Sequence, residues 1–251
     1  MNGNGGGSFR AGPVAYRSFL QLLDANEALQ QSYETLMTSL RLLNDTRALK
    51  VLLFTSARPG EGKTTVVTGL ALAMARAERR VLLVDADLRR PTMHRLLGLD
   101  NTQGLVDIIG GHVRGADAAH TVKISEATGS TTGVLRVVTA GRVAASALDT
   151  LQSPLLTDVI REVAAGYDVV LIDSPPLLAV SDPLLLAPWV DGVVLVVNTG
   201  VVTEADARHA KERVDQAGGR VVGVVMNRFD EQLHGPSFHP YHGYYGRGAT
   251  R

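Results

Sequence analysis

A short loop brings glycine, lysine and threonine residues together at a spacing that can do chemistry. The segment TSARPGEGKTTVV (residues 55–67) follows the apolar run KVLLF (50–54), and in it two glycines precede a lysine and a pair of threonines. Gly60 and Gly62 allow the backbone to curl until successive N–H groups point inward, a geometry that binds anions. The loop is therefore a candidate site for the phosphates of a nucleotide.

Lys63 and Thr64 supply the side chains that such a loop needs. The lysine reaches the outer phosphates, and the threonine hydroxyl can bind Mg²⁺. The usual pattern is G-x-x-x-x-G-K-[ST], and here Ala57 replaces the first glycine. A glycine-rich turn formed by chance is the alternative, but the predicted strand before the loop and the helix after it are those that the motif requires. The predicted nucleotide-binding residues of the loop are Gly60, Glu61, Gly62, Lys63, Thr64 and Thr65.

The segment MNRFD (226–230) bears on the identity of the base. A guanine-specific protein is expected to carry N-K-x-D at this place, and the segment lacks the lysine, which favours ATP. Asn227 and Arg228 complete the predicted ATP-binding set, with Asn227 at the adenine edge. A dehydrogenase fits poorly, because no G-x-G-x-x-G follows the first apolar run.

Three aspartates end predicted strands near this loop. Asp85 and Asp87 stand in VLLVDADLRRPT (81–92), and Asp173 ends a later apolar run. Carboxylates at the carboxyl ends of strands can bind Mg²⁺ and can accept a proton from an attacking hydroxyl. Each aspartate taken alone is equally well explained as a helix N-cap or turn residue. Arg89 contacts a phosphate or a neighbouring acidic residue, or is an exposed arginine at a helix start.

Short β-branched or leucine-rich runs, separated by helix-like segments, must position these residues. The runs are apolar on both sides rather than alternating, which suits strands that helices bury on both faces, and therefore a parallel sheet. Ligands collect at the carboxyl ends of such strands. The expected fold is an α/β three-layer sandwich with a mostly parallel central sheet. The predicted strands are VLLFT (51–55), VLLVD (81–85), LRVVT (135–139), DVVLID (168–173), GVVLVVN (192–198) and RVVGVVM (220–226).

The remaining segments predict the organisation of the chain. Residues 16–43 carry apolar residues at helical spacing and predict one or two helices. Residues 112–133 are the least periodic internal part and predict a surface excursion. The end of the chain, rich in glycine, histidine and tyrosine, cannot pack a core. The predicted divisions are a flexible leader (1–15), one domain (16–229) that begins with N-terminal helices (16–44), and a flexible tail (230–251).

The overall composition narrows the class of protein. The 251 residues contain 25 lysines and arginines against 25 aspartates and glutamates, so no overall field attracts nucleic acid or an anionic membrane. The chain has no cysteine, which excludes disulfides, thiolate metal sites and a cysteine nucleophile. No apolar run approaches the roughly 20 residues that span a bilayer. A cytoplasmic protein with no membrane span and no nucleic acid partner is expected.

Three motifs together resemble those of a known family. SARPGEGKTT (56–65), LLVDADLRRPT (82–92) and VVLIDSPP (169–176) are similar, in this order and at these distances, to the Walker A, Walker A′ and Walker B motifs of the bacterial tyrosine kinases that accompany capsule and exopolysaccharide synthesis. The resemblance covers roughly residues 30–250. It implies a P-loop NTPase fold, shared with the septum-site and plasmid-partition ATPases, whose signature lysine is replaced here by Arg58.

The resemblance implies an ATP-dependent autokinase that acts on tyrosines of its own tail. In the resulting scheme Lys63 neutralises charge on the transferred phosphoryl group, Asp85 takes the proton of the tyrosine hydroxyl, and Asp87 belongs to the catalytic set. A membrane-embedded polysaccharide co-polymerase is the implied activator, which would recruit the chain to the inner face of the plasma membrane. The expected Mg²⁺ ligands are Thr64, Asp87 and Asp173, and the expected phosphoacceptors are Tyr241, Tyr244 and Tyr245.

Two departures from the family pattern concern contacts between subunits and one loop. A glutamate and two arginines that help join subunits in the family correspond here to Gln31, Glu34 and Met37. An N-P-x-E element is replaced by SALD (146–149), in which only the acidic residue survives, as Asp149. A homo-oligomer is expected, and its form as a ring is left open.

Two other functions fit parts of the sequence. A catalytically weak ATP-binding scaffold would regulate polysaccharide assembly through its nucleotide-bound shape, and the lost arginines favour this alternative. A positioning ATPase of the septum-site or partition type is the other. It would be expected to carry the signature lysine and, in membrane-binding versions, an amphipathic terminal helix, and the sequence shows neither.

Overall fold

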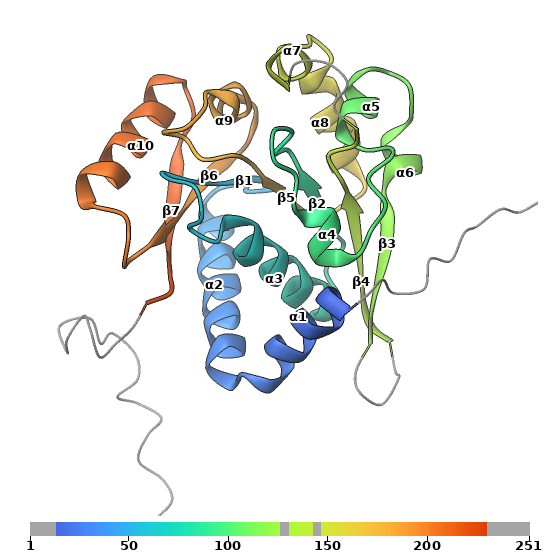
Figure 1. Ribbon diagram of the computed structural model, residues 1–251, viewed down its shortest axis with the longest axis vertical. Coiled ribbons are helices and arrows are strands. Elements are labelled where there is room, and N and C mark those ends of the chain that lie inside the picture. The colour runs from blue at the N-terminus through green and yellow to red at the C-terminus, as the bar shows by residue number, and fades with distance from the viewer. Residues whose placement is uncertain (1–13, 126–130, 143–146, 230–251) are drawn as a thin grey trace, which may run out of the picture.

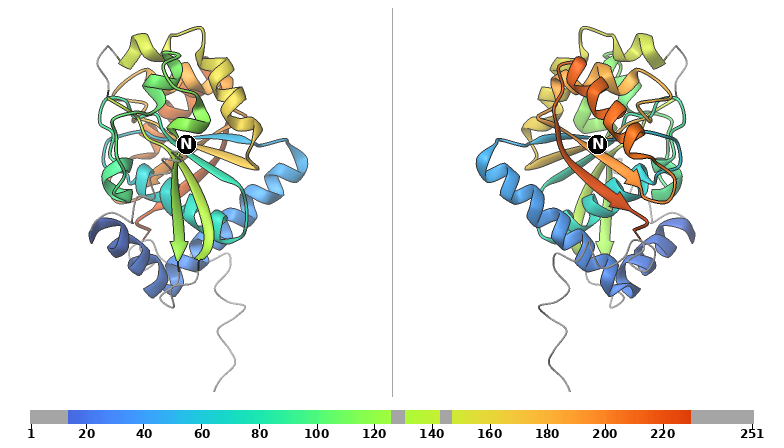
Figure 2. Two further views of the ribbon diagram at one scale, coloured as in Figure 1. Left: turned by 90° about the vertical axis from the view of Figure 1, so that its right-hand side faces the viewer. Right: turned by 90° about the vertical axis from the view of Figure 1, so that its left-hand side faces the viewer.

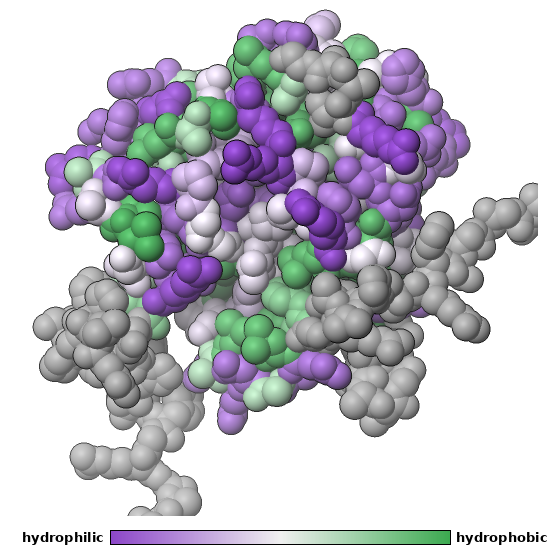
Figure 3. All heavy atoms as spheres, viewed as in Figure 1, coloured by the Kyte–Doolittle hydropathy of each residue, from purple (hydrophilic) through white to green (hydrophobic). Residues whose placement is uncertain are grey.

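The computed structural model describes residues 14–125, 131–142 and 147–229, in which a seven-stranded sheet lies between two layers of helices (Figures 1 and 2). The strand order is β3-β4-β2-β5-β1-β6-β7. All strand pairs are parallel except β3 with β4. The strands are β1 (Val51–Ser56), β2 (Val81–Asp85), β3 (His120–Ser125), β4 (Thr131–Val138), β5 (Val169–Asp173), β6 (Gly192–Asn198) and β7 (Val221–Asn227). The face of the molecule seen in Figure 3 is mostly hydrophilic, and its hydrophobic residues form separate groups.

The helices form one layer on each face of the sheet, and each layer has its own apolar core (Figure 1). The first layer contains α1 (Val14–Ala25), α2 (Glu27–Thr46), α3 (Lys63–Arg76) and α4 (Met93–Leu97). The second contains α5 (Leu105–Ile109), α6 (Gly115–Ala118), α7 (Ala147–Leu151), α8 (Leu156–Ala165), α9 (Asp182–Leu186), a 3₁₀ turn (Ala187–Trp189) and α10 (Glu204–Gln216).

The predicted three-layer sandwich with a mostly parallel sheet is confirmed. Every residue of β1, β2 and β5 is buried, because helices cover both faces of these central strands. This burial explains why the runs in the sequence are apolar on both sides of the strand. All of the predicted runs correspond to strands of the sheet.

The segment 112–133, predicted as a surface excursion, has regular structure in its described part, because it contains α6, β3 and the start of β4. β3 is an antiparallel edge strand. Val122 and Ile124 are buried, whereas Thr121 and Lys123, which alternate with them along the strand, are exposed. An edge strand with one solvent-facing side lacks the continuous apolar run by which the other strands were identified.

The N-terminal helical segment divides at Asn26 into α1 and α2. The Asn26 side chain accepts a hydrogen bond from the Leu29 N–H at 3.0 Å and so caps α2. α2 packs on α3 through Tyr33, which is buried, and whose hydroxyl lies 3.5 Å from the Thr65 carbonyl oxygen. Burial raises the pKa of Tyr33 to about 12. The N-terminal hairpin is thereby joined to the first turn of the helix that follows the phosphate loop.

Gly69 on α3 provides the space for the Tyr33 ring. A Cβ at this position would lie 2.1 Å from the Tyr33 hydroxyl oxygen and 2.3 Å from its Cζ. Glycine inside a helix is intrinsically unfavourable by about 1 kcal/mol relative to alanine. Its presence here is explained by the close approach of α2.

We expect Gly69→Ala to lower the free energy of unfolding by about 1–3 kcal/mol, because the added methyl group overpacks the contact with Tyr33. Urea unfolding measures the change. Gly166→Ala is the control, since a Cβ there has no atom within 4 Å, and this substitution should be neutral or stabilising. In a Tyr33→Ala background the cost of Gly69→Ala should disappear. A Gly69→Ala protein more stable than the wild type would contradict this account.

Candidate active site

Three neighbouring strands bring the predicted site residues to one edge of the sheet. β5 lies between β2 and β1, and its last residue, Asp173, is paired in register with Asp85 on one side and Phe54 on the other. The phosphate loop starts where β1 ends, so it lies beside both carboxylates. The prediction that these residues gather is therefore confirmed for the strand ends.

The phosphate loop is curled as its glycines predicted. Gly60 and Gly62 have φ angles of 81° and 86°, in the left-handed region that glycine adopts without strain. Gly62 is the N-cap of α3, which begins at Lys63. A Cβ on Gly62 would also lie 2.2 Å from the Nδ2 atom of Asn227, so a larger residue is excluded twice. The helix start thus directs its N–H groups toward the loop.

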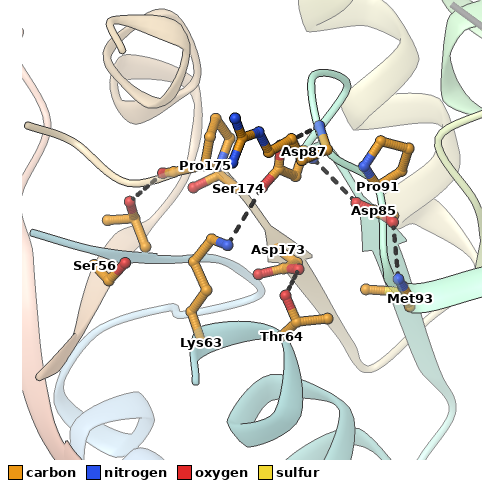
Figure 4. A network of polar contacts seen from close by, with 12 residues as sticks. Ser56, Lys63, Thr64, Asp85, Asp87, Pro91, Met93, Asp173, Ser174 and Pro175 are labelled. Atoms are coloured by element: carbon orange, nitrogen blue, oxygen red, sulfur yellow. Dashed lines mark hydrogen bonds and ion pairs between the residues drawn. The ribbon is translucent and has the colours of Figure 1, made fainter. Parts of the chain in front are cut away.

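Lys63 and Thr64 each contact one of the predicted carboxylates (Figure 4). The Lys63 Nζ atom lies 3.3 Å from Oδ2 of Asp87. The Thr64 hydroxyl donates a hydrogen bond of 2.6 Å to Oδ2 of Asp173. An ion pair therefore links the start of α3 to the turn after β2, and a hydrogen bond links it to the end of β5.

The donor atoms at this place fit a magnesium ion. Oδ1 of Asp173 is buried and has no hydrogen-bond partner. With the Thr64 hydroxyl and the Asp87 carboxylate it forms a set of hard oxygen donors, which Mg²⁺ prefers. Within the described ranges no group of three His, Cys, Asp or Glu side chains is placed to hold a metal by itself. This agrees with the usual behaviour of Mg²⁺, which takes one or two carboxylates and completes its shell with waters and phosphates.

The electrostatics of Asp173 follow from its position. Burial raises the pKa of Asp173 to about 6, although the charge of Lys63 and the Thr64 hydrogen bond oppose this rise. An incoming cation would favour the ionised carboxylate further.

Asp85 occupies a more enclosed position than Asp87. Its side chain is fully buried, and its two oxygens accept the N–H groups of Asp87 at 3.1 Å and of Met93 at 3.3 Å (Figure 4). Burial, and then the charge of Asp173, raise the pKa of Asp85 to about 8. Asp85 therefore shapes the turn that presents Asp87, whereas Asp87 itself contacts Lys63.

Arg89 contacts a neighbouring acidic residue, one of the alternatives that the sequence left open. Its guanidinium binds both oxygens of Asp182, at 2.8 and 2.9 Å. Asp182 is fully buried in the first turn of α9, while the Arg89 side chain is 42% exposed. The pair joins the turn after β2 to the segment after β5, so both carboxylate-bearing loops are held together.

Several residues around the loop have structural contacts that the sequence did not reveal. Glu61 and Asn227, both predicted to bind ATP, contact the protein itself: the Glu61 carboxylate accepts the Asn198 N–H at 3.0 Å, and Asn227 Nδ2 donates to the Glu61 carbonyl at 2.8 Å. Arg58 pairs with Asp206 at the start of α10. Only Asp206 had a local signal, as the fourth residue of the capping box TEAD (203–206).

The remaining predicted residues are placed as follows. Thr65 lies in the first turn of α3, where its carbonyl faces Tyr33. Arg228 directly follows β7 in a left-handed conformation, with φ of 55°. The predicted phosphoacceptors Tyr241, Tyr244 and Tyr245 lie outside the described residues.

Comparisons with known proteins agree with this geometry. The profile of the CobQ/CobB/MinD/ParA nucleotide binding domain matches residues 52–242. Tyrosine-protein kinase YwqD of Bacillus subtilis (strain 168) is 33% identical over 230 residues, which are 92% of this chain and 92% of YwqD. The kinase domain of the Escherichia coli tyrosine kinase ETK is similar with a TM-score of 0.75 and 28% identity, over 84% of this chain and 82% of that one. The cell division ATPase MinD of Pyrococcus furiosus has a TM-score of 0.58 and 26% identity, over 72% of this chain and 73% of that one.

We expect Arg89→Met to lower the free energy of unfolding by about 2–3 kcal/mol, because it leaves the Asp182 carboxylate buried without its partner. The loss is smaller than for a fully buried ion pair, since the Arg89 side chain is partly exposed. Chemical denaturation measures the change. Arg114→Met is the control, since the Arg114 and Asp117 side chains are 82% and 55% exposed, and it should cause no measurable change. Adding Asp182→Asn to Arg89→Met should recover part of the loss. Equal effects of the two arginine substitutions would contradict the assignment.

Proposed function

Since the chain belongs to the bacterial tyrosine kinases and is a protein-tyrosine kinase, we propose that it uses ATP to phosphorylate tyrosines of its own C-terminal tail. The observation that supports this most directly is the pairing of Lys63 with Asp87 and of Thr64 with Asp173 around a curled phosphate loop. Phosphoryl transfer depends mainly on positioning and charge compensation, and this arrangement supplies both. The proposed acceptors are Tyr241, Tyr244 and Tyr245.

The proposed roles follow the contacts of each side chain. The N–H groups of residues 60–65 bind the phosphates, and Lys63 neutralises charge that develops on the transferred group. Thr64, Asp87 and Asp173 hold Mg²⁺, which when bound neutralises charge on the phosphate oxygens. Asn227 keeps its proposed place at the adenine edge, and its amide group at the same time supports the Glu61 carbonyl.

The proton of the tyrosine hydroxyl is proposed to pass to Asp85. Asp85 accepts one backbone N–H with each oxygen, and each carboxylate oxygen keeps a second lone pair that can take the proton. Asp87 contacts Lys63 and is proposed as a Mg²⁺ ligand, and both interactions favour its ionised form. Asp87 is therefore assigned to the metal, and Asp85 to the proton.

We propose that the kinase regulates the synthesis and export of a capsule or exopolysaccharide together with a membrane-embedded partner. Family membership supports this proposal. Across the described parts of the chain, none of the helices has the length and apolarity to cross a lipid bilayer. Recruitment to the inner face of the plasma membrane is proposed to be a role of the partner.

Self-association is proposed to involve α2. Gln31 and Glu34 are exposed on this helix, and Met37 is half-buried. These residues replace the glutamate and the two arginines that help join subunits in the family, so a contact between subunits would not use the same ion pairs.

We expect Lys63→Met to lower tail phosphorylation by about 100-fold or more, because a charge that stabilises the transition state is lost. Anti-phosphotyrosine detection and mass spectrometry after incubation with MgATP measure it. Lys211→Met, which alters a lysine exposed on α10, is the matched control and should keep the wild-type signal. Replacing Tyr241, Tyr244 and Tyr245 by phenylalanine should remove the acceptors. Full signal from Lys63→Met would exclude the proposed mechanism, and ATP binding without any phosphotyrosine would favour the scaffold alternative.

We expect the cytoplasmic segment of the membrane partner to raise the rate of ATP turnover when it is added to the purified chain. An activator that binds the catalytically competent conformation more tightly than the other conformations increases the fraction of molecules in the competent one. Turnover is measured with and without the segment. A scrambled segment of equal charge is the control, and no gain over it would count against the proposed partnership.

A further inference from the structure

Glu61 carries a carboxylate that is buried inside the phosphate loop. The residue is 1% exposed. One oxygen accepts the N–H of Arg58, at the start of the same loop, and the other accepts the N–H of Asn198, at the end of β6, at 3.0 Å. A buried carboxylate is unfavourable unless donors compensate it, and here two backbone N–H groups do so.

Two further contacts connect the same short segment to the neighbouring elements. The Glu61 carbonyl accepts a hydrogen bond of 2.8 Å from Asn227, at the end of β7. The Arg58 guanidinium binds Asp206 at 2.9 and 3.0 Å, and Asp206 also accepts the Thr203 N–H in the capping box of α10. The loop from Arg58 to Glu61 is therefore tied to β6, β7 and α10 by contacts that involve no ligand.

These contacts matter because a phosphate loop must hold its N–H groups in one arrangement. A loop that is disordered before binding loses conformational entropy when the nucleotide orders it. Its apparent affinity equals the affinity of the ordered loop multiplied by the fraction of molecules in which the loop is already ordered. The Glu61 carboxylate is an internal anion that orders the loop from within. It contacts the N–H of Arg58 and not the side chains assigned to the phosphates and the metal.

We propose that Glu61 is a positioning residue, which holds the phosphate loop in its binding conformation before nucleotide arrives by joining Arg58 to Asn198. The inference rests on nucleotide binding at this loop, and it deepens the proposed function without depending on which tyrosines are phosphorylated. Glutamate suits the position because it offers two acceptor oxygens. Glutamine offers one, and its NH₂ group would face the other N–H.

The test compares the wild type with Glu61→Ala and Glu61→Gln. Calorimetric titration should give a dissociation constant for MgADP about 10-fold or more higher for Glu61→Ala, with a smaller rise for Glu61→Gln. The KM for ATP should rise in parallel while kcat at saturation changes much less, because bound nucleotide re-forms the loop. Glu61→Gln also keeps the volume of the side chain, so it serves if Glu61→Ala does not fold.

Asp191→Ala is the matched control. Asp191 also accepts two backbone N–H groups, those of Lys50 and Val51 at 2.8 and 2.7 Å, but at the start of β1, the opposite end of the strand from the loop. It should leave the affinity for MgADP within about 2-fold of the wild type, since the loop keeps its own contacts. A general loss of stability would weaken binding in both variants, whereas a local effect appears only at Glu61.

Hydrogen exchange measures directly how well the N–H groups of the loop are protected. In nucleotide-free protein the N–H groups of Arg58 and Asn198 should exchange slowly in the wild type and rapidly in Glu61→Ala, and MgADP should restore their protection. Unchanged MgADP affinity and unchanged exchange in both Glu61 variants would overturn the proposal, as would a fall in kcat with KM unaltered. Absence of tail phosphorylation in the wild type would contradict the proposed function and leave these binding and exchange results intact.

Discussion

The structure depends on the compensation of charges that are buried at one edge of a parallel sheet. Neighbouring parallel strands end side by side, so the aspartates at the ends of β2 and β5 lie next to the loop that follows β1. Carboxylates packed this closely repel one another, and burial adds to the cost. Lys63 and Thr64 supply the nearest positive charge and donor. The same crowding of negative charge favours the binding of a cation.

The other buried acids near the site are each provided with specific donors. Asp85 has two backbone N–H groups, Asp182 has the Arg89 guanidinium, and Glu61 has the N–H groups of Arg58 and Asn198. Each of these carboxylates also joins segments that are distant in sequence or holds a turn in shape. The buried polar groups thus fix the geometry of loops that have few apolar side chains of their own. Oδ1 of Asp173 differs from them, because it is buried and has no such partner.

Local patterns predicted the central strands and the phosphate loop, and failed where the determining contact is distant in sequence. Central strands have continuous apolar runs, and the phosphate loop carries its own motif, so both were recognised. β3 escaped notice because one of its faces meets solvent. The partner of Arg89 is 93 residues away and the Glu61 contact with Asn198 spans 137 residues, so neither leaves a local signal. A glutamate between two glycines looks like any other loop residue until β6 is placed beside it.

The central position of β1 determines how the molecule can come apart. β1 is hydrogen-bonded to β5 on one side and to β6 on the other, and the two edges of the described sheet are β3 and β7. Fraying begins at edges, and detaching either edge strand breaks none of the hydrogen bonds of β1. The strand from which the phosphate loop starts is therefore shielded from the commonest local openings, and detachment of β7 would remove only the contact of Asn227 with the loop.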